Sequence, residues 1–432
     1  MNYEEALDYI HGIYKFGSKL GLENILYLLN LMGNPHQGLK VIHVAGTNGK
    51  GSTCAYISSV LAAQGYKVGL YTSPYLEEFT ERIRVNGVNI PKEELAEITA
   101  FVKEKVEEML SHGKNHPTEF EVVTAIGFEY FQRQAVDYLV LEVGLGGRGD
   151  STNVIDHPMV SVITPIDFDH MDYLGDTLDK IAYEKAGIIK KNCPVVTYPQ
   201  KPEALKVIED VCGQLDAPLS IAPVDSVEVL RYDDAGQCFH GPYGEEKLEK
   251  LRISMLGEHQ IQNAVVALTA LHVLEKVHHV PISKEALYKG FQKANWPGRL
   301  EVMGRKPTVI IDGAHNVHGM KSLAKAIRTL YKDRRIILAM GMLGDKDVEG
   351  MLQEILPLAD QVIVTKPKNP RAMEPDKLLQ RMAPYQKEAI KKEDIGEAVE
   401  EAMKLASQED VVIFCGSLYM IGDVRRILRS CI

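Results

Sequence analysis

The stretch Val41-Ile-His-Val-Ala-Gly-Thr-Asn-Gly-Lys-Gly-Ser52 passes from an apolar strand into a glycine-rich turn with one lysine, and a helical run, Thr53 to Ala63, follows it. Glycines let successive backbone N–H groups converge on an anion, and the N-terminal end of the next helix adds positive charge. Lys50 supplies the compact charge that outer phosphates need. The stretch therefore predicts a phosphate cradle and the use of a nucleotide.

This loop departs from the general P-loop pattern at two points. The position six before Lys50 is Val44 instead of glycine, and Gly51 separates the lysine from Ser52. The alternative is a strand–turn–helix junction whose glycines only make the turn. Few such turns bring lysine, hydroxyls and glycines together at a strand end, so a variant phosphate loop is the favoured interpretation.

Length and composition limit the possible classes of protein. A chain of 432 residues is long for one hydrophobic core, so two domains are expected. A net charge of -10 argues against a nucleic-acid or anionic-membrane partner. The six cysteines form no C-x-x-C pair, and neither a signal peptide nor a bilayer-length apolar segment is seen. These features predict a cytoplasmic, reduced protein.

The order of apolar segments predicts an α/β fold with two domains. Residues 1–295 alternate strands and helices in the manner of a P-loop ATPase-like parallel sheet, and residues 218–256 add a small antiparallel appendage. The stretch Asn295-Trp-Pro-Gly-Arg299 concentrates helix breakers and is the predicted linker. Residues 296–432 repeat the alternation and predict a smaller, Rossmann-like α/β domain.

Polar residues that follow the predicted strands are the first candidates for a site, because ligands of open α/β sheets bind at the carboxyl ends of strands. Glu142 stands out: a carboxylate inside an apolar strand is costly unless it is paired or binds a metal. The other candidates are Ser73 and the stretch Asp167-Phe-Asp-His170. Oxygen donors at these positions indicate magnesium or phosphate contacts, and a salt bridge is the alternative for Glu142.

His170 and Lys185 remain open when they are considered from the residues alone. A lone histidine is more often a hydrogen-bonded structural residue than a metal ligand. Lys185 would serve equally well as one partner of a surface ion pair on a helix.

Several motifs together resemble folylpolyglutamate synthases, a group that includes bifunctional dihydrofolate synthases and is related to the Mur ligases. The resemblance spans nearly the whole chain. It rests on Gly46-Thr-Asn-Gly-Lys-Gly-Ser52, Tyr71-Thr-Ser-Pro74, Glu81-Arg-Ile-Arg84, Gly144-Leu-Gly-Gly-Arg148, Asp150-Ser-Thr-Asn153, Asp167-Phe-Asp-His170, Glu184-Lys-Ala-Gly187, Gly257-Glu-His-Gln260 with Asn263, Pro297-Gly-Arg299, and Asp312-Gly-Ala-His-Asn316.

The resemblance implies ATP and magnesium (Mg2+) as cofactors. It assigns the ATP phosphates to Thr47, Asn48, Gly49, Lys50, Gly51 and Ser52, and magnesium to Ser73, Glu142 and His170. It further implies nucleotide contacts from Asn263, Arg299 and Asp312, with a simple domain clasp as the alternative role for Arg299. Lys185 would be an N-carboxylated lysine, which requires a setting that lowers the lysine pKa.

The resemblance also implies the substrates, a folate or dihydropteroate and L-glutamate. The acceptor carboxylate would attack the γ-phosphorus of ATP to give an acyl phosphate, and the glutamate amine would displace the phosphate, with Lys50, Lys185 and His315 as the catalytic group. Substrate contacts are expected from Arg82, Asp150, Ser151, His315 and Ser417. Closure of two domains needs no second subunit, so a monomer is expected.

Two questions of activity stay open at this level. Bifunctional relatives tend to have Asp-Ala-Thr where this chain has Asp150-Ser151-Thr152, which puts dihydropteroate as an acceptor in doubt. The rival functions are a Mur-type ligase that acts on a UDP-sugar peptide and a nucleotide-hydrolysing switch. The Glu81-Arg-Ile-Arg84 stretch favours a folate over the first, and the second α/β domain weighs against the other.

Overall fold

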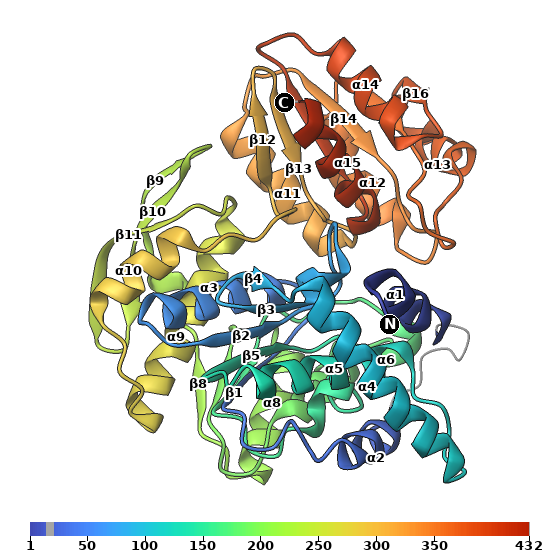
Figure 1. Cartoon of the computed structure of the whole chain (residues 1–432). Coiled ribbons are helices and arrows are strands. Elements are labelled where there is room, and N and C mark those ends of the chain that lie inside the picture. Colours follow the sequence, from blue (N-terminus) through green and yellow to red (C-terminus); the bar gives the residue numbers. More distant parts are fainter. Residues whose placement is uncertain (14–20, 432) are drawn as a thin grey trace.

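The computed structural model describes residues 1–13 and 21–431 and forms two α/β domains, one above the other in Figure 1. The larger, N-terminal domain contains an eight-stranded sheet in the order β4-β3-β2-β5-β1-β6-β7-β8. Its strands are β1 (Val41–Ala45), β2 (Val68–Tyr71), β3 (Ile83–Val85), β4 (Val88–Asn89), β5 (Tyr138–Glu142), β6 (Val160–Ile163), β7 (Val195–Thr197) and β8 (Leu219–Ile221).

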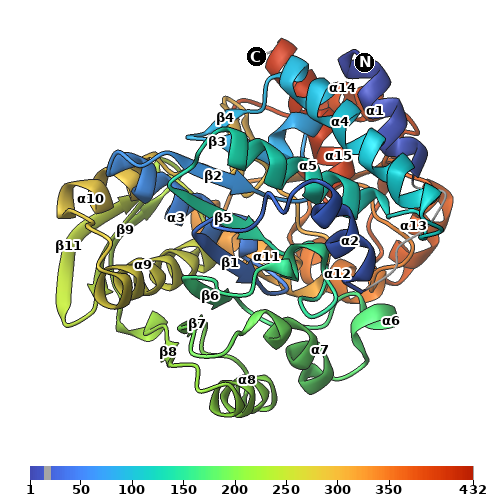
Figure 2. The ribbon, with the colours of Figure 1, turned by 60° about the horizontal axis from the view of Figure 1, so that its bottom comes forward.

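The central strands of this sheet are apolar on both faces because helices cover both, as Figure 2 shows. Alternate residues of β1 enter opposite cores: Ile42 and Val44 belong to one, and Val41 to the other. The first core contains α3 (Lys50–Ala63), α9 (Glu258–His278) and α10 (Lys284–Lys293). The second contains α1 (Tyr3–Gly12), α2 (Glu23–Leu31), α4 (Lys92–Ser111) and α5 (Glu119–Arg133), and α7 (Leu178–Lys185) and α8 (Pro202–Gln214) form a neighbouring core.

The antiparallel appendage is a separate three-stranded sheet of β9 (Glu228–Asp233), β10 (Gly236–Tyr243) and β11 (Glu246–Ile253). Its extent differs from the prediction of residues 218–256. The first segment of that stretch is β8, which pairs parallel with β7 and so belongs to the main sheet. The sheet also gains an antiparallel hairpin, β3 and β4, that was not predicted.

The C-terminal domain has a six-stranded sheet in the order β12-β13-β17-β14-β15-β16. Its strands are β12 (Glu301–Arg305), β13 (Thr308–Ile311), β14 (Ile336–Met340), β15 (Gln361–Val364), β16 (Ala389–Lys391) and β17 (Val411–Cys415). Only β12 runs antiparallel to its neighbour. The faces are covered by α11 (Val317–Leu330), α12 (Val348–Ile355) and α13 (Pro375–Met382) on one side and by α14 (Ile395–Leu405) and α15 (Leu418–Cys431) on the other.

The segment 74–79, which we call the arm, reaches from the N-terminal domain to the C-terminal domain. Leu76 packs against the core under α15, and a β-carbon on Gly422 would collide with the Leu76 carbonyl oxygen. Glu77 is ion-paired with Arg425 of α15, which also donates hydrogen bonds of 2.8–3.0 Å to Glu301. The arm therefore ties the loop after β2 to the second domain.

Among the helices that the structure describes, none combines the length and apolarity needed to cross a bilayer. The six cysteines are free thiols; four are buried, whereas Cys431 is exposed.

Candidate active site

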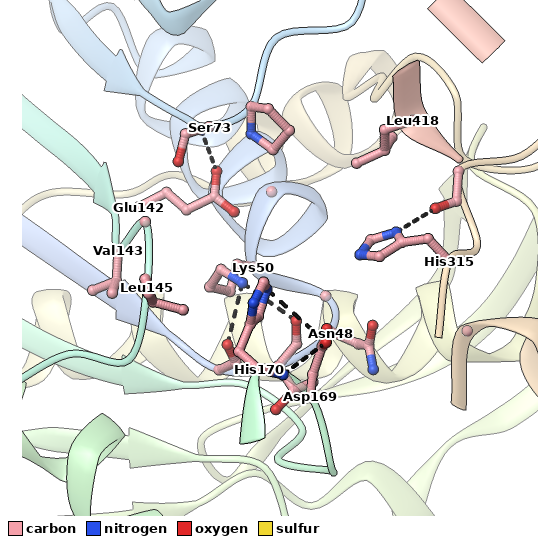
Figure 3. A pocket seen from close by; sticks show the side chains of 18 of the residues that line it. Asn48, Lys50, Ser73, Glu142, Val143, Leu145, Asp169, His170, His315 and Leu418 are labelled. Atoms are coloured by element: carbon pink, nitrogen blue, oxygen red, sulfur yellow. Dashed lines mark hydrogen bonds and ion pairs between the residues drawn. The ribbon is translucent and has the colours of Figure 1, made fainter. Parts of the chain in front are cut away.

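One cavity of about 510 Å³ lies between the two domains, where the strand ends of both sheets meet. All of the residues predicted for the site line it: Thr47, Asn48, Gly49, Lys50, Gly51, Ser52, Ser73, Arg82, Glu142, Asp150, Ser151, His170, Lys185, Asn263, Arg299, Asp312, His315 and Ser417. Figure 3 shows Ser73 and Glu142 on one side of the cavity and His315 on the other, with Lys50 between them.

The phosphate loop connects β1 to α3, and its backbone is held by the neighbouring strand β6. The Thr164 hydroxyl, one residue past β6, donates to the Asn48 carbonyl at 2.8 Å, and the Thr47 N–H donates to the Pro165 carbonyl at 2.9 Å. Gly49 has φ +84° and caps α3, a conformation that favours glycine. The first turn of α3 lines the cavity and has no side-chain cap, so the backbone amides that begin the helix are available to an anion.

Two lysines meet at this loop. The Lys50 ammonium group donates to the carbonyls of Gly46 and Thr47 at 3.1 and 3.3 Å, and that of Lys185 donates to Gly46 at 2.9 Å. Lys185 is only 4% exposed. Burial, assisted by the positive charge of Lys50, lowers the pKa of Lys185 from 10.5 to about 7. A substantial fraction of Lys185 is therefore neutral near physiological pH.

Glu142 is the last residue of β5 and is buried at the cavity wall. Its Oε2 atom accepts a hydrogen bond of 3.0 Å from the Ser73 N–H, as drawn in Figure 3, and no described residue donates to Oε1. Burial raises the pKa of Glu142, whereas the charges of Lys50, Arg299 and Arg82 oppose that shift. A carboxylate with one free oxygen beside a serine hydroxyl suits a hard cation.

His170 and Asp169 occupy the loop after β6. The His170 side chain is 41% exposed at the cavity. Desolvation there lowers its pKa to about 4 against the opposing charge of Asp169, and the positive charge of Lys346 acts in the same direction as desolvation, so the imidazole is neutral at pH 7. The Asp169 carboxylate binds the Lys346 ammonium at 2.6 Å and accepts a hydrogen bond of 3.2 Å from Asn316. Asp169 therefore joins the N-terminal domain to two segments of the C-terminal domain.

His315 and Ser417 form part of the C-terminal wall. The Gly313 carbonyl accepts a hydrogen bond of 2.7 Å from His315 Nδ1, which leaves Nε2 with its lone pair in the neutral ring. Burial lowers the pKa of His315 to about 4. The buried Ser417 hydroxyl has no hydrogen-bond partner among the described residues, so it is available to a ligand.

Arg82 and Asp150 both line the cavity and differ in how many of their polar atoms are already hydrogen-bonded. The Arg82 guanidinium stacks over Tyr75 and Phe79, at 5.2 and 5.5 Å from the ring centroids, and its Nε has no partner among the described residues. Both Asp150 oxygens are already engaged: Oδ2 by the Leu145 N–H at 2.8 Å and Oδ1 by Thr152. These contacts of Asp150 hold the loop 144–149 in its conformation.

Asp312 shows a similar pattern on the C-terminal side. Its two oxygens accept hydrogen bonds from the N–H groups of Leu300 and Ala314, at 2.7 and 2.8 Å. It therefore fixes the chain beside Arg299, which lines the cavity next to it.

Lys346, His318 and Arg371 are among the cavity residues that sequence reasoning missed. Lys346 follows strand β14, so the rule that ligands lie at strand ends was a usable signal. His318 lies 3.0 Å from the side-chain nitrogen of Asn48, across the two domains, and no local pattern marks that contact.

A phosphate loop, a buried carboxylate and a buried lysine, completed by a second α/β domain, define a ligase of the Mur type. In agreement, residues 44–271 match the Mur ligase middle domain and residues 298–418 match the Mur ligase glutamate ligase domain. The chain belongs to the folylpolyglutamate synthase/dihydrofolate synthase family within that class.

The assignment rests on relatives that match over nearly their full length. The chain is 39% identical to the Bacillus subtilis dihydrofolate synthase/folylpolyglutamate synthase, over 99% of both chains, and 36% identical to the Lacticaseibacillus casei folylpolyglutamate synthase, again over 99% of both. The crystal structure of the Thermotoga maritima folylpolyglutamate synthase superposes with a TM-score of 0.86 at 37% identity, covering 100% of this chain and 97% of the other. The Mycobacterium tuberculosis folylpolyglutamate synthase complexed with ADP gives 0.89 at 31% identity, covering 99% of each chain.

Proposed function

We propose that this chain is an ATP-dependent acid–amino-acid ligase that attaches L-glutamate to the terminal carboxylate of a folate. The observation that carries this function is the interdomain cavity, which joins the phosphate loop, Glu142 and Lys185 to the Ser417 hydroxyl of the second domain, a group with no partner among the described residues. The names of the relatives supply the folate and the glutamate.

The first step is transfer of the γ-phosphoryl group to the acceptor carboxylate. The carboxylate oxygen attacks the γ-phosphorus, the bond to the β,γ-bridging oxygen breaks, and an acyl phosphate and ADP result. Two anions repel, so the Lys50 charge and the amides of the first turn of α3 must offset the negative charge that they share. We assign Thr47 to Ser52, Asn263, Arg299 and Asp312 to the nucleotide.

Magnesium fits the donors on the N-terminal wall. Glu142 offers an oxygen without a donor, Ser73 a neighbouring hydroxyl, and His170 a neutral imidazole whose ring nitrogen keeps a lone pair. Bound there, the ion would supply positive charge to the phosphates. The protein's part is to hold these three donors at the ends of β2, β5 and β6.

Lys185 is the proposed site of N-carboxylation. With its pKa near 7, a neutral amine is present to attack the carbon of carbon dioxide; the new N–C bond gives a carbamate as one proton leaves to solvent. The product would replace a buried cation with an anion that faces Lys50.

The second step is attack of the glutamate amine on the acyl phosphate with release of inorganic phosphate. We place the incoming glutamate at His315 and Ser417, and the acceptor at Arg82, Asp150 and Ser151. A histidine with a pKa near 4 is a weak base. We therefore propose that His315 orients the glutamate amine by accepting a hydrogen bond from it, and does not act as the general base that removes its proton.

The test measures ADP release by the purified chain with each substrate omitted in turn. Ligation requires that ADP release depend on both the pteridine and L-glutamate, whereas a nucleotide-hydrolysing switch would release ADP without either. The Mur-type rival would need a UDP-sugar peptide as acceptor.

Dihydropteroate deserves a separate assay, because the Bacillus subtilis relative carries both activities in its name while the Lacticaseibacillus casei relative carries one. Turnover with tetrahydrofolate and none with dihydropteroate would support the inference that Ser151, in place of the alanine of Asp-Ala-Thr, goes with the loss of dihydropteroate as an acceptor.

We further propose a domain boundary at residues 295/296. We also propose a monomer, since closure of two domains of one chain needs no second subunit. The free thiols support a reducing location, the cytoplasm.

A further inference from the structure

The only tryptophan of the chain, Trp296, packs directly on the phosphate loop. A β-carbon built on Gly51 would lie 2.7 Å from three atoms of the indole, Cε2, Cζ2 and Nε1. Ordinary carbon–carbon contacts begin near ~3.5 Å, so an alanine at this position and the indole exclude each other. The three atoms are consecutive on the rim of the indole, so the β-carbon would meet the ring system at its Nε1–Cε2–Cζ2 side.

The backbone of Gly51 gives no independent reason for glycine. It lies in the first turn of α3 and does not have the positive φ of Gly46 and Gly49. In an α-helix an alanine is favoured over glycine by about 1 kcal/mol. The indole is therefore the neighbour that accounts for glycine between Lys50 and Ser52.

Trp296 also contacts strand β3 and lies within the linker. The Arg84 guanidinium of β3 lies over the indole, 5.5 Å from its centroid. Three residues later, Arg299 lines the cavity, and between them the Gly298 carbonyl accepts a hydrogen bond of 2.8 Å from the Gly313 N–H. A displacement of the first turn of α3 would therefore push against the second residue of the linker.

We propose that Trp296 is a positioning residue that keeps the first turn of α3 and the interdomain linker in register, so that Arg299 meets the nucleotide bound on that turn. Gly51 is the notch that admits the indole. This inference rests on the proposed nucleotide site and adds a route by which occupation of the phosphate loop reaches the second domain.

A double-mutant cycle on the full chain tests the contact. Gly51→Ala is expected to weaken ADP binding, measured by calorimetry, about tenfold in the native background and less than about threefold when Trp296→Ala is also present. Trp296→Ala alone is expected to raise the KM for ATP and leave the KM for glutamate unchanged. An equal loss from Gly51→Ala in both backgrounds would overturn the proposal, because glycine would then be required by the nucleotide itself.

The native protein provides a second readout that does not depend on any variant. Since Trp296 is the sole tryptophan, its fluorescence should change saturably with ADP and stay constant with L-glutamate alone. Constant emission at saturating ADP contradicts the proposal.

These outcomes are distinct from failure of the proposed function. In that case ADP release would not depend on pteridine and glutamate, whereas the calorimetric cycle would still report on the contact. If only the positioning role is wrong, ligation is normal and the two substitutions are additive.

Discussion

The two walls of the cavity are built differently. The N-terminal wall places Glu142, Asp150 and Lys185 at strand ends or helix ends, each less than 5% exposed and each bonded to backbone groups of its own domain. The C-terminal wall approaches through side-chain contacts that cross the gap, such as Lys346 with Asp169 and Asn316 with Asn48. Within the C-terminal wall, Asp312 and His315 are also held by backbone groups of their own domain. Only the contacts that cross the gap depend on how the two domains are placed.

The largest expected effect comes from the N-terminal wall, at Lys50. Lys50→Met removes the charge that offsets the phosphates and is expected to lower kcat about 10³-fold. The measurement is ADP release that depends on folate and glutamate. Lys206→Met, at an exposed lysine paired with Asp210, is the matched control and should retain full activity. A decrease in kcat of less than tenfold for Lys50→Met would contradict a catalytic role for Lys50.

The burial of Lys185 in the same wall is expected to make the stability of the chain depend on pH. The folded pKa of Lys185, about 7, lies below the unfolded value of 10.5, so the unfolded chain binds more protons between these values and stability rises with pH across that window. Relative to Lys185→Met, the native chain should gain about 3 kcal/mol between pH 6.5 and 9.5.

The comparison at Lys185 uses urea denaturation in buffer free of carbon dioxide. Lys180→Met, at an exposed lysine of the same helix, should show no such pH dependence relative to the native chain. Parallel pH profiles for the native chain and Lys185→Met would mean that Lys185 keeps an ordinary pKa.

Glu142 separates charge from shape on this wall. Glu142→Gln keeps the side-chain volume and an acceptor for the Ser73 N–H, but removes the negative charge. We expect an activity about 10²-fold lower at fixed magnesium and a higher magnesium concentration for half-maximal rate. Glu209→Gln on the exposed face of α8 is the control. An unchanged magnesium titration would assign the ion elsewhere.

The smallest effect is expected where the second domain is attached. Arg425→Met leaves Glu77 and Glu301 without their shared partner and loosens the arm. Because the arm leads to Arg82, the KM for the folate should rise about tenfold, with a smaller change in the KM for ATP. Arg328→Met, at an exposed position of α11, is the control for the loss of a positive charge. Equal rises in both constants would show that Arg425 stabilises the whole interface and not the arm.

The same contrast explains how far the sequence predicted the molecule. Apolar runs such as Val41–Ala45 and Tyr138–Glu142 predicted the central strands, and the strand-end rule led to Glu142 and Ser73. The edge strands β4, β12 and β16, and β3 next to the edge, were not predicted because they are short and carry polar residues. Edge strands need little apolar surface, so their pattern is weak.

Contacts between the domains could not be predicted from local patterns. Asp169 and Lys346 are separated by 177 positions, and Asn48 and His318 by 270. Helical and strand periodicities relate residues only a few positions apart, so they give no information on pairs this far apart in the sequence. These pairs form only because one sheet is placed against the other. The motif Asp167-Phe-Asp-His170 contained Asp169, yet nothing in it indicated a lysine from the second domain.

The arm has a consequence for chimeric enzymes made from two relatives. Because Leu76 packs with the core under α15 and Glu77 pairs with Arg425, residues 74–79 form part of the surface on which the second domain folds. A chimera that exchanges only residues 296–431 would pack α15 of one relative against the arm of the other. The natural unit of exchange is discontinuous: it comprises the C-terminal domain together with a six-residue segment from the other end of the chain.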